Sequence, residues 1–370
     1  MLASLPLPRL IFGAGALAAL AGELALLGVR RPLLLSDRGL ERVGAVARAA
    51  QALHGRAVEY LDVPENPTCA GADAAYATFQ KGGCDGVVAL GGGSVIDTAK
   101  FVAALATGES RRAADLLGRP DLISRSIAPL IAIPTTVGTG SESSPVSALH
   151  KDSGGSPIGT RSPLLVPRLA ICDPDLVRTL PARLIAATGV DALGHCIEGY
   201  FAEPVNPIVD ALALDGIARV YADIQTAVQP DGDAARASLM AAAFAGGAAI
   251  HKGLGPAHAI ALAFGDQHLH HGTLVAAALP WTTDLVARHA PHKAARIAAA
   301  MGLRNTGELG AALHALTRAL GLPGNLRSAG YRVDSIDRLV ADMLGSHFNR
   351  TSPYVPTGDE YATIAQELLS

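Results

Sequence analysis

Asp191 and His195 stand four residues apart in the segment TGVDALGHCIEGY, residues 188–200. If this segment is helical, one turn places both positions on the same face, so that a carboxylate oxygen and an imidazole nitrogen can approach one point. Further imidazoles follow at His258 and in the run HHG at 270–272. Three imidazoles and one carboxylate can bind a divalent transition metal and leave one position open for a substrate.

An isolated Asp-x-x-x-His pair more often caps or ion-pairs a helix than binds a metal. The clustering of histidine changes that balance, because five of the 12 histidines lie between His251 and His271, in a largely apolar region where unpaired polar groups are costly. Cys196 follows His195, but a helix turns it about 100° away. We therefore interpret Cys196 as a packed residue and not as a ligand.

The composition limits the class of protein. The chain has 370 residues, of which 49% are hydrophobic and 4% aromatic, which is enough for two domains with substantial cores. A net charge of −3 with no basic run argues against nucleic acid as a partner. The four cysteines, Cys69, Cys84, Cys172 and Cys196, form no Cys-x-x-Cys pair, which favours a reduced cytoplasmic setting.

The apolar run from Leu10 to Gly22 resembles part of a signal peptide, but Arg9 is the single early positive charge and Glu23 interrupts the run. We expect a buried opening strand and helix here, and neither a signal peptide nor a membrane-spanning segment.

The first half of the chain alternates short β-prone runs with helical stretches. The expected strands are 31–37, 57–63, 86–90 and 127–133. One expected helix follows the first strand and ends at about residue 54, and two others span 70–81 and 94–106. This alternation predicts a parallel, Rossmann-like α/β sheet covered by helices.

From about residue 180 the pattern becomes helical throughout. The expected helices are 183–201, 207–228, 233–250, 273–289, 306–320 and 333–345. We predict an NAD(P)-binding α/β domain over residues 1–178 and an all-α, metal-binding catalytic domain over 179–370, with the segment Cys172–Pro181 as the hinge.

A glycine triplet follows the expected strand 86–90 and precedes a helix. Glycines let the backbone approach a pyrophosphate, and the free N–H groups at the start of the helix favour an anion. Ser94 and Asp97 also resemble a capping box, so a simple tight turn with a capped helix is the alternative. The predicted cofactor contacts here are Gly91, Gly92, Gly93, Ser94 and Asp97.

Two further segments favour a nucleotide site. Asp37 ends an earlier strand, where a carboxylate can bind the ribose 2′-OH of NAD and repel the 2′-phosphate of NADP. The segment 134–142, PTTVGTGSE, offers hydroxyl groups after another strand, and ligands of open parallel sheets bind at the carboxyl ends of strands. The predicted contacts here are Thr135, Thr136, Thr139 and Ser141.

Together these segments resemble the iron-containing (group III) alcohol dehydrogenase family. The resemblance rests on FGAGAL (12–17), LLLSD (33–37), PENPT (64–68), GGGSVIDTAK (91–100), IPTTVGTGSE (133–142), CDPDLVRTLP (172–181), TGVDALGHCIEGY (188–200) and GLGPAH…HHG (253–272). It implies a dinucleotide-binding domain, a helical metal-binding domain and a cleft between them.

The resemblance also implies a ligand set and a reaction. Asp191, His195, His258 and His271 match the metal ligands, with His270 as the second choice for the fourth. The implied reaction is reversible hydride transfer between C4 of the nicotinamide and an alcohol or carbonyl compound held at the metal. We expect NAD with NADP as the alternative, Fe²⁺ with Zn²⁺ as the alternative, small alcohols or aldehydes as substrates, no membrane partner, and a homodimer or larger homo-oligomer.

Two positions depart from the family pattern. Leu262 stands where the family commonly has a histidine near the nicotinamide, and Pro157 stands where many members have a lysine. Two other functions therefore remain open: a non-redox lyase resembling dehydroquinate synthase, which would need a basic substrate pocket, and a cofactor-binding protein without catalysis. Between residues 250 and 272 Lys252 is the single permanent cation, which argues against the lyase.

Overall fold

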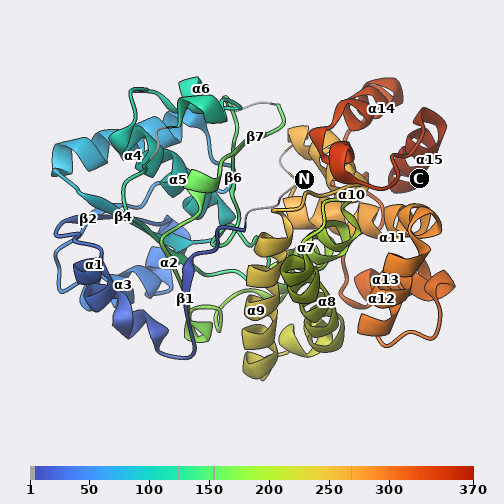
Figure 1. The fold of residues 1–370 in the computed structure, drawn as a ribbon, viewed down its shortest axis with the longest axis horizontal. Coiled ribbons are helices and arrows are strands. Elements are labelled where there is room, and N and C mark those ends of the chain that lie inside the picture. Colours follow the sequence, from blue (N-terminus) through green and yellow to red (C-terminus); the bar gives the residue numbers. More distant parts are fainter. Residues whose placement is uncertain (1–4, 124–125, 153–154, 268) are drawn as a thin grey trace. The chain divides into compact units, whose positions relative to one another are not determined.

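The computed structural model describes residues 5–123, 126–152, 155–267 and 269–370. They form two compact units, which Figure 1 shows in colours that follow the sequence. The sheet unit contains Pro6–Thr136 and Ser141–Leu180. The helical unit contains Val137–Gly140 and Pro181–Ser370.

A six-stranded parallel sheet organises the sheet unit, as the alternating pattern predicts. The strand order is β1-β8-β5-β4-β2-β3. The strands are β1 (Arg9–Phe12), β2 (Pro32–Leu35), β3 (Val58–Tyr60), β4 (Gly86–Gly91), β5 (Leu130–Pro134) and β8 (Leu169–Cys172). The central strands are short and fully buried, which is why their sequences are continuously apolar and not alternating.

Helices cover both faces of this sheet, because successive side chains of a strand point to opposite faces. Leu33, Val87 and Leu130 belong to one core, which includes residues of the helices α4 and α5. Leu34, Val88 and Ile131 belong to the other, which includes residues of α1 and α3. The helices of this unit are α1 (Leu20–Leu26), α2 (Arg38–Arg42), α3 (Ala45–Ala52), α4 (Cys69–Gly82), α5 (Gly93–Thr107) and α6 (Ala113–Leu116), with the 3₁₀ turns η1 (Ala16–Ala19), η2 (Pro120–Leu122), η3 (Pro163–Leu165) and η4 (Pro174–Leu176).

The opening strand differs from the prediction. β1 was expected to be buried, yet it is the edge strand, pairs with β8, and leaves Leu10 and Phe12 44% and 43% exposed. The sequence pattern also missed β8 and the antiparallel pair β6 (Val146–Leu149) and β7 (Ile158–Arg161). These strands have four residues each, too few to show a period.

The helical unit is built around α7 (Ala182–Phe201), whose residues from Ile185 onward are all buried. It packs against α8 (Pro207–Ala227), α9 (Asp233–Ala249) and α11 (His271–His289). Gly194 permits the approach to α11, because a Cβ there would lie 2.8 Å from Val275 Cγ1. The remaining helices are α10 (Pro256–Ala263), α12 (Pro291–Ala300), α13 (Leu309–Ala319), α14 (Ile336–Gly345) and α15 (Gly358–Leu369), with η5 (Gly265–Gln267), η6 (Thr306–Glu308) and η7 (His347–Thr351).

All six predicted helices of this half are present, whereas α10, α12 and α15 were not predicted. In the part of the chain that the structure describes, no helix combines the length and the apolar character that a membrane span requires.

Candidate metal centre and nucleotide site

The helix α7 presents Asp191 and His195 on one buried stripe. Their side chains are one turn apart, and Asp191 Oδ1 lies 3.8 Å from His195 Nε2. The helical spacing therefore brings a carboxylate and an imidazole together, as the sequence predicts.

Two more imidazoles reach the same carboxylate oxygen from other helices. His258 Nε2, on α10, lies 3.6 Å from Asp191 Oδ1, and His271 Nε2, at the first residue of α11, lies 3.7 Å from it. The ring centroids of His195 and His258 are 4.7 Å apart. The side chain of His271 is 48% exposed, whereas the other three are nearly fully buried, so the centre is open on the His271 side.

These donors fit a divalent cation. Asp191 Oδ1 and His258 Nε2 are buried, and neither has a hydrogen-bond partner among the described residues. Two ligands that each lie about 2.0–2.2 Å from one ion are separated by roughly 3–4 Å, which is the spacing seen here. Asp191, His195 and His258 each offer a ligand atom, and these atoms lie within 4.8 Å of one another. A shared cation is the simplest way to satisfy these atoms.

The charges at the centre also suit a cation. Burial would raise the pKa of Asp191, but the three surrounding imidazoles outweigh it and hold that pKa below its ordinary value, so the carboxylate is ionised. Burial lowers the pKa of His195 to about 4, and the Asp191 carboxylate offsets only part of this effect. His195 is therefore neutral near pH 7, with a lone pair available for a metal.

The pKa of His258 shifts in the opposite direction from that of His195. Burial would lower its pKa, but the nearby Asp191 and Glu198 carboxylates outweigh burial and raise it to about 9. A metal that binds His258 at neutral pH must therefore displace a proton.

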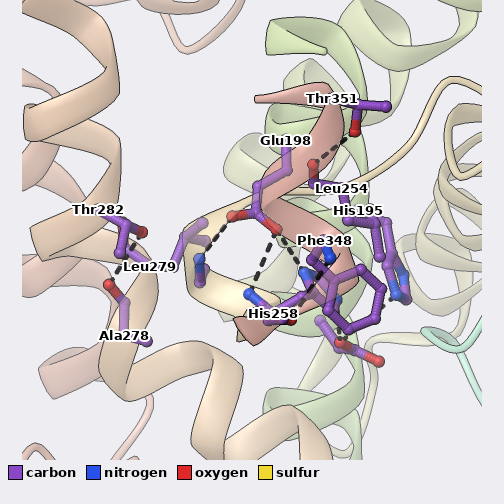
Figure 2. Close-up of polar contacts among 12 residues, drawn as sticks. His195, Glu198, Leu254, His258, Ala278, Leu279, Thr282, Phe348 and Thr351 are labelled. Atoms are coloured by element: carbon purple, nitrogen blue, oxygen red, sulfur yellow. Dashed lines mark hydrogen bonds and ion pairs between the residues drawn. The ribbon is translucent and has the colours of Figure 1, made fainter. Parts of the chain in front are cut away.

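Glu198 is the residue that the sequence analysis missed. Figure 2 shows its carboxylate directed at His258, whose Nδ1 lies 2.5 Å from Glu198 Oε2. A signal was present in the sequence, because Asp191, His195 and Glu198 occupy positions i, i+4 and i+7 of one helical stripe.

Three further histidines lie close to His258 and His271 in the sequence: His251, His268 and His270. His270 is the N-cap residue of α11 and precedes His271, while His251 follows the end of α9. His268 lies outside the described residues. Leu262 lies on α10, one turn after His258.

In the sheet unit, three predicted cofactor segments lie at the same edge of the sheet. β5, β4 and β2 are neighbours and parallel, so their carboxyl ends coincide. Asp37 follows β2, the glycine triplet begins at the last residue of β4, and Thr135 follows β5. The chain passes from β2 outward to β3 and then returns to β4 on the other side, so the β2–β4 boundary is a topological switch point. Ligands of open parallel sheets bind at such points.

The glycine turn is as tight as expected, but its cap is not the predicted one. A Cβ at Gly91 would lie 2.5 Å from Val95 Cβ, and α5 begins at Gly93 with Gly92 as its N-cap. Ser94 is already inside the helix and its hydroxyl donates to Glu65 O at 2.5 Å. The capping-box interpretation is therefore wrong, because the helix starts earlier than the pattern suggested.

Asp97 belongs to a buried polar cluster beneath this turn. It accepts hydrogen bonds from Ser141 Oγ at 2.5 Å and Ala148 N at 2.8 Å. The fully buried Lys100 donates to the carbonyl of Ser144, and burial lowers its pKa to about 8. In this structure Asp97 and Ser141 thus join α5 to the following segment. Thr139, another predicted contact, belongs to the helical unit.

A glycine turn at the switch point of a parallel sheet, and a cluster of one carboxylate and three imidazoles on helices, are typical of an enzyme that uses a nucleotide and a metal. Family models match both halves of the chain. Residues 8–174 match the iron-containing alcohol dehydrogenase model, and residues 185–369 match the C-terminal model of the Fe-containing alcohol dehydrogenase family. The chain belongs to the iron-containing alcohol dehydrogenase family.

Individual relatives agree with this assignment. The chain is 39% identical over 369 residues to a 4-hydroxybutyrate dehydrogenase of Cupriavidus necator, with 96% of each chain covered. It resembles the structure of a 1,3-propanediol oxidoreductase with a TM-score of 0.94, 28% identity and complete coverage of both chains. It also resembles a sulfoacetaldehyde reductase from Bifidobacterium kashiwanohense, solved with NAD⁺, with a TM-score of 0.92, 26% identity and coverage of 100% and 99%.

The protein is therefore an oxidoreductase that acts on CH–OH groups, and its family implies a nicotinamide cofactor and a metal. The lyase alternative is not favoured, since these relatives are dehydrogenases and reductases.

Proposed function

We propose that this protein is an NAD-preferring, Fe²⁺-dependent alcohol dehydrogenase that also reduces the corresponding aldehydes. The observation that carries the proposal is the convergence of three imidazole nitrogens on Asp191 Oδ1 at 3.6–3.8 Å. When bound, the metal supplies Lewis acidity to the substrate oxygen and the nicotinamide supplies the hydride acceptor.

The chain's own residues divide this work. Asp191, His195, His258 and His271 hold the metal, and because one ligand is anionic and three are neutral, the centre keeps net positive charge. The residues 1–178 bind the cofactor through the turn at Gly91–Gly93, and the residues 179–370 supply the metal ligands. The stripe of α7 fixes two of the ligands on one rigid element, which keeps their geometry precise.

The metal proposed is iron(II), with zinc as the alternative. Imidazole and carboxylate donors bind both ions, so the donor set alone does not choose between them. Iron is preferred on the strength of the family to which the chain belongs.

Cofactor choice is attributed to Asp37. Its carboxylate accepts a hydrogen bond from Leu40 N at 2.9 Å, as the N-cap of α2, and it stands at the β2 end of the switch point. The neighbouring Arg38 forms ion pairs with Asp62 at 2.8 Å and Glu41 at 3.0 Å. Because its guanidinium group is held by these carboxylates, we do not assign it to a 2′-phosphate.

We expect Asp37→Gly to narrow the preference for NAD over NADP by on the order of 1–3 kcal/mol, through lost ribose hydrogen bonds and relieved repulsion. The measurement is kcat/KM for both cofactors. Glycine is a tolerated N-cap that costs only a few tenths of a kcal/mol, so folding should be retained. Asp37→Asn is the matched control, because it preserves the cap and removes the charge alone. Equal wild-type kcat/KM values for NAD and NADP would contradict the role of Asp37.

Small primary alcohols and hydroxy acids are the proposed substrates. Phe348, on η7, lies with its ring centroid 5.7 Å from that of His258, so one wall next to the metal ligands is apolar. The 39% identity to a 4-hydroxybutyrate dehydrogenase makes 4-hydroxybutyrate the first compound to test.

The function is tested with protein loaded separately with iron and zinc. Alcohols (4-hydroxybutyrate, ethanol and 1,3-propanediol) are assayed with NAD and NADP, and the matching aldehydes with the reduced cofactors. We expect net formation of NADH with at least one alcohol and its loss on treatment with a chelator. Protein that binds NAD and metal but produces no NADH with any alcohol would instead support a binding protein without catalysis.

The exposed edge of the sheet and the cysteines bear on the oligomeric state and the cellular setting of the protein. The edge strand β1 exposes Leu10 and Phe12, and an exposed apolar edge is suited to pairing with another chain, so we propose a homodimer or larger homo-oligomer. The four cysteines are all free thiols, which is compatible with the cytoplasmic setting that we propose.

A further inference from the structure

We infer that Glu198 is a positioning residue for the metal centre, which orients His258 and fixes which of its ring nitrogens is available to a metal. This inference rests on the proposed function, since it assigns a role toward the proposed ligand His258. It adds a residue that lies outside the ligand set and acts through it.

The contacts of Glu198 are directed at one short segment. Its Oε1 accepts a hydrogen bond from Ala257 N at 2.6 Å, and its Oε2 accepts from His258 N at 3.4 Å and contacts His258 Nδ1 at 2.5 Å. Glu198 is 5% exposed, so these contacts are made out of water. One buried carboxylate therefore holds both the backbone at the start of α10 and the ring that this helix carries.

The surrounding backbone is shaped to admit this carboxylate. A Cβ at Gly255 would lie 2.9 Å from Glu198 Oε1, so a side chain at this position would collide with it. The preceding residue, Leu254, accepts a hydrogen bond from Thr351 Oγ1 at 3.1 Å, as Figure 2 shows. The loop before α10 is thus anchored next to the point that Glu198 reaches.

The Glu198 carboxylate determines which ring nitrogen of His258 carries the proton. A carboxylate only accepts hydrogen bonds, so the Nδ1 of His258 must carry the proton that is donated to Glu198. In the neutral ring, Nε2 then holds the lone pair, and Nε2 is the atom that faces Asp191 Oδ1 at 3.6 Å. A carboxylate that accepts the other ring proton also increases the basicity of a ligating histidine.

Glu198→Gln isolates this role from packing. Glu198 lines a small cavity with Ile197, Phe201 and Thr282, and truncation to alanine would enlarge it. Glutamine keeps the shape of the side chain but has only one oxygen. If that oxygen serves Ala257 N, the amide NH₂ faces His258 and demands a lone pair on Nδ1, which moves the proton to Nε2 and blocks the ligand.

The matched control is Asp284→Asn. Asp284 lies on α11 in the same unit, and its Oδ1 accepts a hydrogen bond from Gly310 N at 2.8 Å near the start of α13. This variant replaces a carboxylate that also serves a helix start but touches no proposed ligand. His258→Ala is the second reference, because it removes the proposed ligand itself.

The experiment measures zinc affinity by chelator competition for the full-length wild type, Glu198→Gln, Asp284→Asn and His258→Ala, together with the unfolding midpoint of each metal-free protein. We expect Glu198→Gln to bind zinc 10–100-fold more weakly than the wild type, with a metal-free unfolding midpoint close to that of the Asp284→Asn control. In proton NMR spectra of the zinc-loaded wild type, the His258 Nδ1–H should appear as a downfield, exchange-protected resonance. Glu198→Gln should lose this resonance.

Two results would overturn the inference. In the first, Glu198→Gln binds zinc as tightly as the wild type and keeps the ring N–H resonance, whereas His258→Ala has lost the metal. In the second, Glu198→Gln and Asp284→Asn lose zinc affinity to the same extent, and their unfolding midpoints fall equally. The role of Glu198 would then be purely structural. If His258→Ala itself keeps zinc, the ligand assignment of the proposed function fails instead.

Discussion

Asp191→Ala should leave the protein without bound metal and without detectable alcohol oxidation. The side chain is the one anionic donor among four proposed ligands, and its Oδ1 is the atom on which the three imidazoles converge. Its loss should weaken metal binding by more than the 10–100-fold typical of a residue that only supports a ligand. Metal content after dialysis and kcat with the best alcohol substrate are the measurements.

The control for this variant is Cys196→Ala, on the same helix. Cys196 is fully buried and its thiol lies 3.8 Å from Ala242 O, on the side of α7 that packs against α9. Its removal tests packing of α7 without touching the proposed ligands, so metal and turnover should persist. An Asp191→Ala protein with wild-type metal content and turnover would refute the ligand set.

His270→Ala should lower kcat by roughly 10²–10⁴-fold, the usual contribution of a general acid–base group. The resemblance to the family implies a histidine near the nicotinamide at the position of Leu262. If that histidine carries protons in the family, they must leave by another route here. Among His251, His268 and His270 we favour His270, since it adjoins the proposed ligand His271 at the start of α11. The measurements are kcat across the pH range, bound metal and the Kd for NAD.

The metal and cofactor measurements separate two roles for His270. Unchanged metal content and NAD affinity with a reduced kcat support a proton relay, whereas loss of metal would make His270 the fourth ligand in place of His271. His289→Ala is the control, because His289 stacks on Tyr354 with the ring centroids 3.7 Å apart, at the end of α11 away from His271. If the alanine variants of all three candidate histidines keep wild-type kcat, the solvent or the cofactor ribose must carry the proton.

Some features could be predicted because they depend on local chain geometry. The run Pro32–Leu35 is continuously apolar because it lies inside a parallel sheet, and that pattern is visible without a structure. In the same way, the i, i+4 spacing of Asp191 and His195 predicts that they share one helix face, and α7 is helical through both residues. The glycines at the end of β4 also mark a turn that side chains at Gly91 and Gly92 would obstruct.

Other features depend on partners that are distant in sequence. The family motif suggested His258 as a ligand, but its approach to Asp191 depends on how α10 packs beside α7, and its contact with Glu198 spans sixty residues. Asp97 looked like a capping residue locally, whereas its actual partners, Ser141 and Ala148, lie beyond the next strand. Local propensity carries no information about such pairings.

By itself, then, the sequence determined the alternating sheet, the helical second half and the stripe of α7, since each follows from a period or a turn within a few residues. Only the tertiary structure decided that β1 is an exposed edge and that three imidazole nitrogens converge on Asp191 Oδ1. It also decided that Glu198 is the acceptor for His258. These outcomes arise from which elements bury one another, and burial is a property of the whole fold.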